Sequence, residues 1–318
     1  MEPIEISVII STYNRDTSLK DTIESLLSQS LSKNNFEIII VDNNSNDNTS
    51  KLASEYNKNK AHSIRYVLEK EQGLSKARNR GSKEAKGEII TFIDDDAIAD
   101  KYLLEKILDV YDHYPQASII GGKIKPVWSI NKPSWLTKNL ETYYSLLDLG
   151  DEIMEINFPQ TPFGCNFSIK RQLFLDLGGF SADLGRTGTN LLSGEEIYLC
   201  YLSELNNNKS YYVPKAIVYH RIPPERLNRY FLIKRSFYQG ISNIVFQKIC
   251  KKNKNYSLLT YLTKLKNIIK NIIKNLLRPK SNLLTEDFIK MLSTLGSIYE
   301  LSLNSLRPNK RIKRNDAK

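Results

Sequence analysis

The sequence predicts an α/β fold, a mainly parallel sheet with helices on both faces, followed by a helical extension at the C-terminus. Over the first hundred residues, short β-branched apolar runs alternate with segments of helical spacing. The apolar runs are nearly continuous, as in strands that are buried on both faces of a parallel sheet. From residue 243 onward the composition shifts to Lys, Asn, Ile and Leu. We therefore expect a main domain over 1–240 and a basic, amphipathic helical region over 241–318.

In chain order, the apolar runs predict strands at 6–10, 36–41, 64–68 and 89–93. Helices are expected between them, around 19–27 and over about 49–57, 75–86 and 100–113. Further strands are predicted at 117–124, 165–170 and 211–219, and further helices at 171–177 and 194–206. The segment 126–162 is rich in Pro, Trp and Tyr and is expected to form a loop insertion.

Polar side chains follow three of the predicted strands. Ser11–Asn14 comes after the first strand, Asp42 after the second and Asp94–Asp96 after the fourth. Ligands of parallel α/β sheets bind beyond the carboxyl ends of the strands. We therefore expect these side chains to meet in one cleft.

The three consecutive carboxylates of Asp94–Asp96 would repel one another and lose hydration at the end of a buried strand. A divalent cation that also binds phosphate oxygens would offset this cost, because Mg²⁺ prefers such ligands. His220 closes a later predicted strand and is a further candidate metal ligand. The alternatives are a solvated turn or a helix cap for the Asp residues and a structural role for His220. Asp94–Asp96 lie at the third strand end in the series that is polar, which favours a bound cation over these alternatives.

Two further side chains are candidates for contact with a nucleotide. Asp42 can accept a hydrogen bond from an N–H group of a base, or it forms an Asx turn with Asn43 and Asn44. Arg78 lies on a predicted helix and suits phosphate or base recognition, although an arginine on a helix is more often solvated.

Glu195 and Glu196 follow Gly194 in the first turn of a predicted helix. Acidic side chains in a first turn commonly interact with the helix dipole, which is enough to explain one of the two. A second carboxylate that faces a sugar would be able to deprotonate an acceptor hydroxyl. Both residues are therefore candidates for a catalytic base.

Six motifs occur in the order found in a known family. They are SVIISTYNR (Ser7–Arg15), VDNNSNDNT (Val41–Thr49), EQGLSKARNRG (Glu71–Gly81), FIDDDA (Phe92–Ala97), GCNFSIKRQLFLDLGGF (Gly164–Phe180) and GEEIYL (Gly194–Leu199). Across about residues 4–240 the chain resembles the inverting family 2 glycosyltransferases, which have the GT-A fold. Residues 214–240 resemble, more loosely, members that take part in bacterial surface or exopolysaccharide assembly.

The resemblance implies transfer of a sugar, with inversion, from a nucleotide-sugar, most commonly a UDP-sugar, with the help of Mn²⁺ or Mg²⁺. The expected donor contacts are Thr12, Tyr13, Asn14, Arg15, Asp42, Arg78, Asp94 and Asp95. The expected cation ligands are Asp94 and Asp96, with His220 as the further candidate. The base is implied at Glu196, where the family has Asp, so the choice between Glu195 and Glu196 stays open.

Positive charge is concentrated in the last third of the chain. Residues 221–318 contain 22 Lys and Arg against five Asp and Glu, a net charge of +17, whereas residues 1–220 carry −6. One helical stripe holds bulky aliphatic residues and another holds Lys, namely Leu262, Leu265, Ile268, Ile269, Ile272, Ile273 and Leu276 against Lys266, Lys270, Lys274 and Arg278. This pattern predicts peripheral binding of 258–280 to an anionic membrane, or a core-facing helix with a solvated basic face. Few aromatic residues are available for stacking, so nucleic acid is not an expected partner.

The composition also bounds the cellular setting. The three scattered cysteines fit a reducing compartment and argue against a disulfide framework or a zinc site. The first residues lack the basic start and long apolar stretch of a signal peptide, and no uncharged apolar window reaches the length of a spanning helix. We expect a cytoplasmic protein, peripheral on the inner face of the cell membrane, that acts on a glycan or a lipid-linked acceptor.

Two other functions are compatible with parts of this pattern. A nucleotidyltransferase that makes nucleotide-sugars would use a related α/β sheet, but it usually has a Gly-rich loop after the first strand, and Ser11–Arg15 contains no glycine. A non-catalytic scaffold that binds nucleotide-sugars at the membrane would not need the acidic residues at 94–96 and 195–196.

Overall fold

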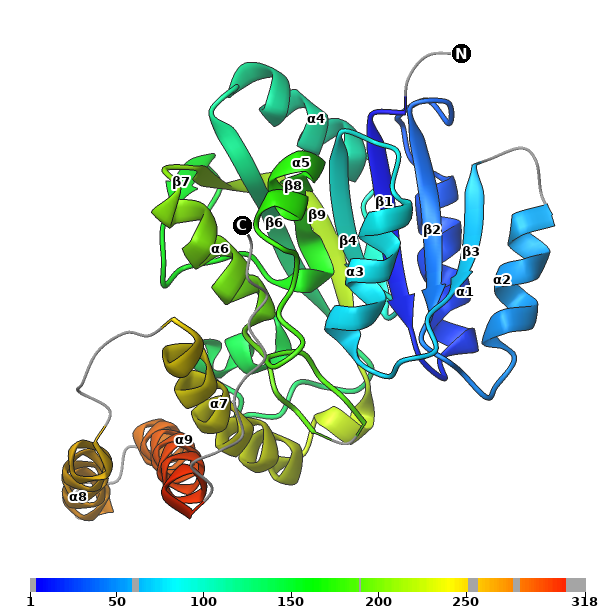
Figure 1. Ribbon diagram of the computed structural model, residues 1–318. Coiled ribbons are helices and arrows are strands. Elements are labelled where there is room, and N and C mark those ends of the chain that lie inside the picture. Colours follow the sequence, from blue (N-terminus) through cyan, green and yellow to red (C-terminus); the bar gives the residue numbers. More distant parts are fainter. Residues whose placement is uncertain (1–3, 59–62, 189, 251–256, 277–280, 307–318) are drawn as a thin grey trace.

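The computed structural model describes residues 4–58, 63–188, 190–250, 257–276 and 281–306. Its centre is a single mixed sheet in the order β3-β2-β1-β4-β8-β6-β9-β5, with β7 paired to β9 (Figure 1). The strands are β1 (Ile6–Thr12), β2 (Phe36–Asp42), β3 (Ile64–Leu68), β4 (Ile89–Asp94), β5 (Ala97–Ala99), β6 (Ala117–Trp128), β7 (Met154–Ile156), β8 (Phe167–Lys170) and β9 (Lys209–Ile222).

The first half of the chain forms the parallel part of the sheet. β3, β2, β1 and β4 are parallel neighbours, whereas β8 pairs antiparallel with β4 and β6. Because the side chains of a strand alternate, Val8 and Ile10 enter the core on one face and Ile9 the core on the other. Burial on both faces explains why these strands are apolar throughout. The predicted α/β fold is confirmed.

Helices cover both faces of the sheet. α1 (Asp16–Leu27), α2 (Thr49–Lys58) and α4 (Leu103–His113) pack on one face, and α3 (Leu74–Glu84), α5 (Arg171–Asp176) and α6 (Glu195–Leu205) pack on the other. The second core includes an aromatic cluster in which the Phe92 and Phe180 ring centroids lie 4.9 Å apart. These helices lie close to their predicted positions.

The segment expected as a loop insertion carries regular structure at both ends. β6 continues to Trp128, pairing parallel with β9 after an irregularity in register near Gly122. A 3₁₀ helix, η1 (Lys138–Tyr144), and strand β7 lie within 126–162, and shorter 3₁₀ turns, η2 (Gly164–Asn166) and η3 (Pro224–Arg226), follow. The rest of the segment is irregular, as expected for a loop insertion, and only these short elements differ from that expectation. Lys123, Lys125 and Pro126 interrupt the apolar pattern of β6, which conceals this extension in the sequence.

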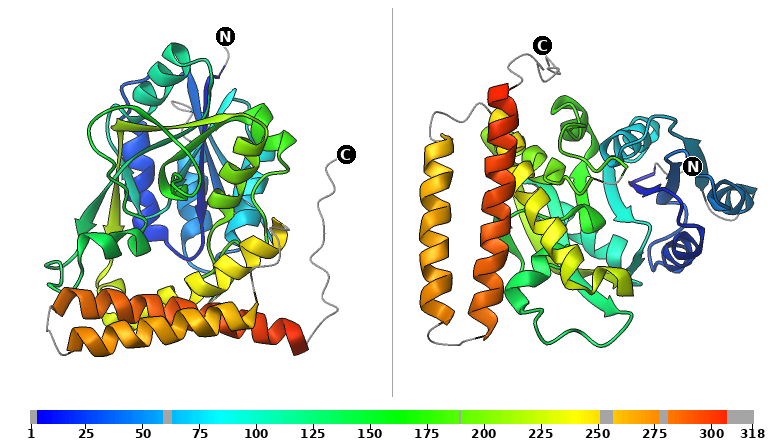
Figure 2. Two further views of the ribbon diagram at one scale, coloured as in Figure 1. Left: turned by 90° about the vertical axis from the view of Figure 1, so that its left-hand side faces the viewer. Right: turned by 90° about the horizontal axis from the view of Figure 1, so that it is seen from below.

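Three long helices follow β9. α7 (Arg229–Ile249) lies under the main domain, and α8 (Leu258–Leu276) and α9 (Ser281–Leu306) run side by side as an antiparallel pair (Figure 2). The predicted C-terminal helical extension is confirmed. Residue 240 falls inside α7, so this helix continues from the predicted main domain into the extension. The division of the chain at 240 stays a prediction.

Glycines bring α7 and α9 into direct backbone contact. A Cβ atom on Gly240 would overlap the Ser293 carbonyl, and one on Gly296 would overlap the Phe237 carbonyl. The Ser297 hydroxyl donates a hydrogen bond to the Gly240 carbonyl at 3.0 Å, across the same contact. No described helix is long and apolar enough to cross a membrane.

Candidate active site

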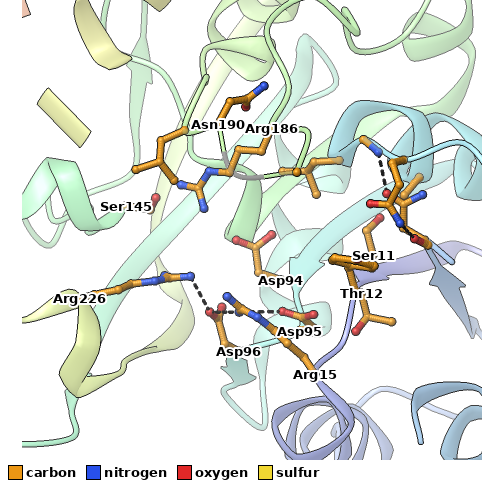
Figure 3. Close-up of a pocket in the computed structure, with 18 of the residues that line it drawn as sticks. Ser11, Thr12, Arg15, Asp94, Asp95, Asp96, Ser145, Arg186, Asn190 and Arg226 are labelled. Carbon is orange, nitrogen blue, oxygen red and sulfur yellow. Dashed lines mark hydrogen bonds and ion pairs between the residues drawn. The ribbon is translucent and has the colours of Figure 1, made fainter. Parts of the chain in front are cut away.

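A cavity of about 300 Å³ opens at the carboxyl ends of β1, β2 and β4 (Figure 3). Ser11 and Thr12 end β1, and Tyr13 and Arg15 follow it. Asn43 follows β2, Asp94 ends β4, and Asp95 and Asp96 follow it. The remaining lining residues lie at the start of α3, just after η1, in the loop before α6, in β9, in η3 and in α7. They are Gln72, Gly73, Leu74, Ala77, Ser145, Arg186, Gly188, Asn190, Leu191, His220, Arg226 and Phe231. The polar strand ends thus meet in one place, as expected for a parallel sheet.

Two arginines neutralise part of the acidic triplet. Arg15 Nη1 lies 3.1 Å from Asp95 Oδ1 and also pairs with Asp96, while Arg226 Nη2 lies 3.4 Å from Asp96 Oδ2 (Figure 3). Burial raises the pKa of Asp95 to about 7, against the lowering effect of Arg15. Burial has the same effect on Asp96, but the hydrogen bond and charge of His220 and the charges of Arg226 and Arg15 outweigh it and hold its pKa below the usual range.

The same residues fit a divalent cation. Asp94, Asp96 and His220 each place one ligand atom so that all three lie within 4.8 Å of one another. His220 Nδ1 lies 2.9 Å from the Tyr144 carbonyl oxygen, so this nitrogen carries a hydrogen and Nε2 is the nitrogen that faces Asp96. Nε2 lies 3.3 Å from Asp96 Oδ1. Two acceptor atoms at that distance repel unless a proton or a cation lies between them, so this donor set suits Mn²⁺ or Mg²⁺.

A second cavity, of about 240 Å³, adjoins the first and contains both candidate bases. Leu74, Asp94, Ser145 and Arg186 line both cavities, whereas Glu195 and Glu196 line only the second. The first cavity contains most of the expected donor contacts and is called the donor cavity below. The second contains both candidate bases and is called the base cavity. Asp94 stands at their junction.

Arg78 lines the base cavity and contacts Asp94, which lines both cavities. Its guanidinium is almost fully buried and lies 2.8 Å from Asp94, 3.1 Å from Glu195 and 3.1 Å from Glu196. Burial disfavours its charge, but the three carboxylates outweigh this effect and raise the pKa of Arg78. Arg78 is therefore not solvated, although an arginine on a helix more often is. One guanidinium instead fixes three carboxylates that come from β4 and α6.

The two glutamates differ in their surroundings. Glu196 Oε1 accepts hydrogen bonds from Arg78 and from the Gly164 N–H at 3.0 Å. A Cβ atom at position 164 would overlap both partners, so only glycine leaves room for this contact. Glu195 is 3% exposed, and its Oε2 has no hydrogen-bond partner among the described residues. Burial and the charge of Glu196 raise the pKa of Glu195 to about 8.

Three of the predicted nucleotide contacts, Asp42, Asn14 and Arg78, do not line the donor cavity, and Arg78 lines the base cavity instead. Asp42 is buried, and its carboxylate accepts hydrogen bonds from the Ser45 N–H at 2.8 Å and from the Tyr66 hydroxyl at 2.9 Å. Asn14 has a positive φ of 52° and accepts a hydrogen bond from the Asn46 N–H. Asn43, the neighbour of Asp42, does line the cavity, and the nucleotide role of Asp42 and Asn14 stays a prediction.

Sequence reasoning did not identify Arg186, Arg226 or Arg235. Arg186 lies in the loop before α6, Arg226 in η3 and Arg235 on α7. Arg186 lines both cavities, Arg226 lines the donor cavity and Arg235 lines the base cavity. Each is flanked in the sequence by ordinary loop or helix residues, and no spacing pattern links them to Asp94–Asp96. The only available signal, the basic character of the last third of the chain, covers Arg226 and Arg235 but not Arg186.

Comparison with known proteins gives a consistent result. The family model described as glycosyl transferase family 2 matches residues 7–178. A glucosyl-dolichyl phosphate glucuronosyltransferase of Haloferax volcanii is 27% identical over 282 residues, which span 84% of this chain and 87% of that protein.

Solved structures share the fold. The mannosyltransferase PcManGT from Pyrobaculum calidifontis, in complex with GDP-Man and Mn²⁺, aligns with a TM-score of 0.64 at 17% identity, over 98% of this chain and 90% of that one. Residues 1–349 of S. aureus TarS, in complex with UDP, align with a TM-score of 0.54 at 18% identity, over 99% and 95%. The family model covers more than half of the chain, so this protein belongs to glycosyl transferase family 2.

Proposed function

We propose that the protein transfers a sugar, with inversion, from a nucleotide-sugar to a hydroxyl of a saccharide or lipid-linked acceptor. A UDP-sugar is the proposed donor, and the synthesis of a bacterial surface polysaccharide or another glycan is the proposed setting. The support is the family assignment and the names of the similar proteins, one of which acts on a dolichyl phosphate-linked sugar while another was solved with UDP. Family membership also favours this function over that of a nucleotidyltransferase.

The single observation that carries the proposal is the junction of the two cavities at Asp94. The donor cavity holds the acidic triplet and three other candidate donor contacts, Thr12, Tyr13 and Arg15, and the base cavity holds Glu196. Arg78 touches Asp94 and Glu196 at once, so its guanidinium fixes the candidate base relative to the candidate cation site. A sugar at the junction would have the nucleotide on one side and the acceptor on the other.

Each group of residues then has a proposed role. Thr12, Tyr13 and Arg15 contact the nucleotide. Asp94, Asp96 and His220 hold Mn²⁺ or Mg²⁺, which when bound neutralises the charge that grows on the departing diphosphate.

Glu196 accepts the proton of the attacking acceptor hydroxyl. Its Oε1 is held by Arg78 and Gly164, which orients the carboxylate and leaves Oε2 for the hydroxyl. Glu195 lies deeper, and the raised pKa of this residue suits a neutral, structural carboxyl group.

A thermal-shift screen of nucleotide-sugars, with and without Mn²⁺ or Mg²⁺, tests the donor proposal. A ligand that binds the native state raises the unfolding midpoint by an amount that grows with its affinity and concentration, so the base, the sugar and the metal requirement are obtained together. We expect a UDP-sugar with a cation to give the largest shift. If no nucleotide-sugar raises the midpoint under any condition, the proposal is wrong. Release of nucleotide from the selected donor then separates an enzyme from a non-catalytic scaffold.

We further propose that α8 binds the surface of an anionic membrane, on the cytoplasmic face of the cell membrane. Leu262, Ile269, Ile273 and Leu276 are 42–61% exposed along one side of α8, while Ile268 is buried against the neighbouring helix. Lys266, Lys270 and Lys274 are exposed beside this apolar side. Exposed aliphatic residues flanked by lysines are the pattern of an interfacial helix, and anionic lipid adds about 1 kcal/mol of attraction per charge. Residues 277–280, the end of the predicted 258–280 segment, lie outside the described residues.

Flotation of the full chain with vesicles tests this surface. We expect binding to vesicles that contain phosphatidylglycerol, weaker binding to neutral phosphatidylcholine vesicles, and loss of binding when Leu262 and Ile273 are both replaced by Asn. The matched control replaces Asn267 and Asn271, on another side of α8, by Ser. Equal binding by both double variants would contradict the proposal.

A further inference from the structure

Five arginines reach the two cavities, and they fall into two groups. Arg15, Arg78 and Arg226 each have a carboxylate partner within 3.4 Å. Arg186 has no side-chain hydrogen bond or ion pair within the described part of the chain, and Arg235 has no carboxylate partner there. The paired arginines are explained by the acidic residues around them, and the two others are not.

Arg235 is an unusual buried cation. It projects from α7 into the base cavity and is only 7% exposed. Within the described residues its one hydrogen bond runs from Nη2 to the Ser193 hydroxyl oxygen at 3.0 Å, while Nε and Nη1 are buried and have no partner there. Burial, reinforced by the charge of Arg186, lowers the pKa of Arg235 to about 10. A guanidinium that keeps unsatisfied donors inside a cavity costs stability, so a ligand for those donors would offset the cost.

Arg186 lies close enough to add a second positive charge. Arg186 lines both cavities, and its charge contributes to the lowered pKa of Arg235, while the charges of Glu195 and Glu196 act in the opposite direction. Figure 3 shows Arg186 reaching into the space beside Asp94, from the side opposite Arg226. Two guanidinium groups that line one cavity and have no carboxylate partner among the described residues repel each other, and a single anion between them would relieve that repulsion.

We propose that Arg235, assisted by Arg186, binds an oxyanion of the acceptor in the base cavity, next to the hydroxyl that Glu196 deprotonates. The inference rests on the proposed function and narrows its substrate class to acceptors that carry a phosphate ester or a carboxylate. Guanidinium groups bind both oxyanions through paired N–H donors. The donor diphosphate is not the partner of Arg235, because Arg235 lines the base cavity and not the donor cavity.

The geometry also assigns a positioning task to this contact. Arg235 and Glu196 line the same cavity, so an acceptor held by its anion would present a neighbouring hydroxyl to the base. Thr142, Tyr143 and Gln239 line the same cavity with polar atoms that suit sugar hydroxyls. Neutral acceptors would lack the contact and would be bound more weakly.

The test measures anion binding to the full chain with the donor cavity filled by UDP and Mg²⁺. Inorganic phosphate, glucuronate and neutral glucose are titrated separately, and the unfolding midpoint and calorimetric Kd are recorded. We expect phosphate or glucuronate to raise the midpoint while glucose does not. Binding by phosphate alone would identify a phosphate ester as the acceptor group, and binding by glucuronate alone would identify a carboxylate; either result supports the proposal.

The variant Arg235→Gln keeps a donor for Ser193 and removes the charge. We expect the Kd of the anion to rise about tenfold or more, since a charge-assisted bidentate contact is lost. The unfolding midpoint of the ligand-free variant should rise, because an unpaired buried charge has been removed. The matched control is Arg229→Gln, which removes an exposed arginine from the first turn of the same helix and should change neither value.

Two outcomes would overturn the inference: no anion binds the wild-type protein, or Arg235→Gln binds it as tightly as the wild type does. A merely structural arginine would instead give a lower midpoint in Arg235→Gln with unchanged anion binding. UDP provides the separate readout of the proposed function. If UDP does not bind, that function fails as a whole; if UDP binds and phosphate and glucuronate do not, only the anion site fails.

Discussion

Replacing each of the two adjacent glutamates by glutamine should separate the catalytic base from its neighbour. Glu196→Gln preserves the shape of the site, because the amide oxygen can still accept the hydrogen bonds from Arg78 and from the Gly164 N–H, which are 3.1 Å and 3.0 Å long. The variant loses only the capacity to take a proton. Removal of a general base typically lowers a rate by about 10²- to 10⁴-fold, so we expect a loss in that range.

Glu195→Gln should have a much smaller effect. Burial and the charge of Glu196 raise the pKa of Glu195 to about 8. The protonated form of this side chain is therefore favoured near neutral pH. Glutamine resembles the protonated carboxyl in size and in hydrogen bonding. We therefore expect the rate to fall by less than about tenfold.

The assay is the initial rate of nucleotide release from the donor that the thermal-shift screen selects, with the cation present at saturation. Thermal unfolding of each variant, with and without UDP, controls for folding and for donor binding. A greater loss in Glu195→Gln than in Glu196→Gln would refute the assignment. So would a loss of less than tenfold in Glu196→Gln, because water or another group would then be accepting the proton.

Four other changes follow from the same structure. The pKa of Glu195 is higher in the folded protein than its ordinary value of 4.5, so the native state binds an extra proton between these two values. The free energy of unfolding should therefore fall as pH rises toward 8, by up to about 1.4 kcal/mol per pH unit. Glu195→Gln should flatten this dependence in denaturant titrations carried out at several pH values. Gly164→Ala would place a methyl group on Glu196, so nucleotide release should fall at least tenfold while UDP binding persists; an unchanged rate would contradict the contact. Asp96→Ala should abolish nucleotide release and remove the additional midpoint shift that Mn²⁺ gives to UDP; retention of that shift would place the cation elsewhere. Gly240→Ala should lower the free energy of unfolding by about 1–3 kcal/mol, because α7 and α9 are in backbone contact there, and an unchanged unfolding midpoint would contradict that packing.

Local sequence was sufficient for the parallel half of the fold. Each of the first four strands is a mostly apolar run with polar residues at or just after its end, and both features lie within fewer than ten consecutive residues. The prediction failed at β6, whose second half contains Lys123, Lys125 and Pro126. Those residues are held as a strand by pairing with β9, about ninety residues later, and no local pattern reports that pairing.

The sequence by itself determined the fold class, the acidic triplet after β4 and the adjacent pair of glutamates, because these depend on neighbouring residues. Only the tertiary structure decided which of them act together. The antiparallel pairing of β5 with β9 sets Ala97 opposite His220 and so brings the histidine to Asp96. Arg78 joins Asp94 to Glu196, although 118 positions separate the arginine from that glutamate. Arg226 and Arg235 enter the cavities from the segments that follow β9. Charged side chains far apart in the chain meet where the folded strands and helices end, and that meeting depends on packing that no short sequence window contains.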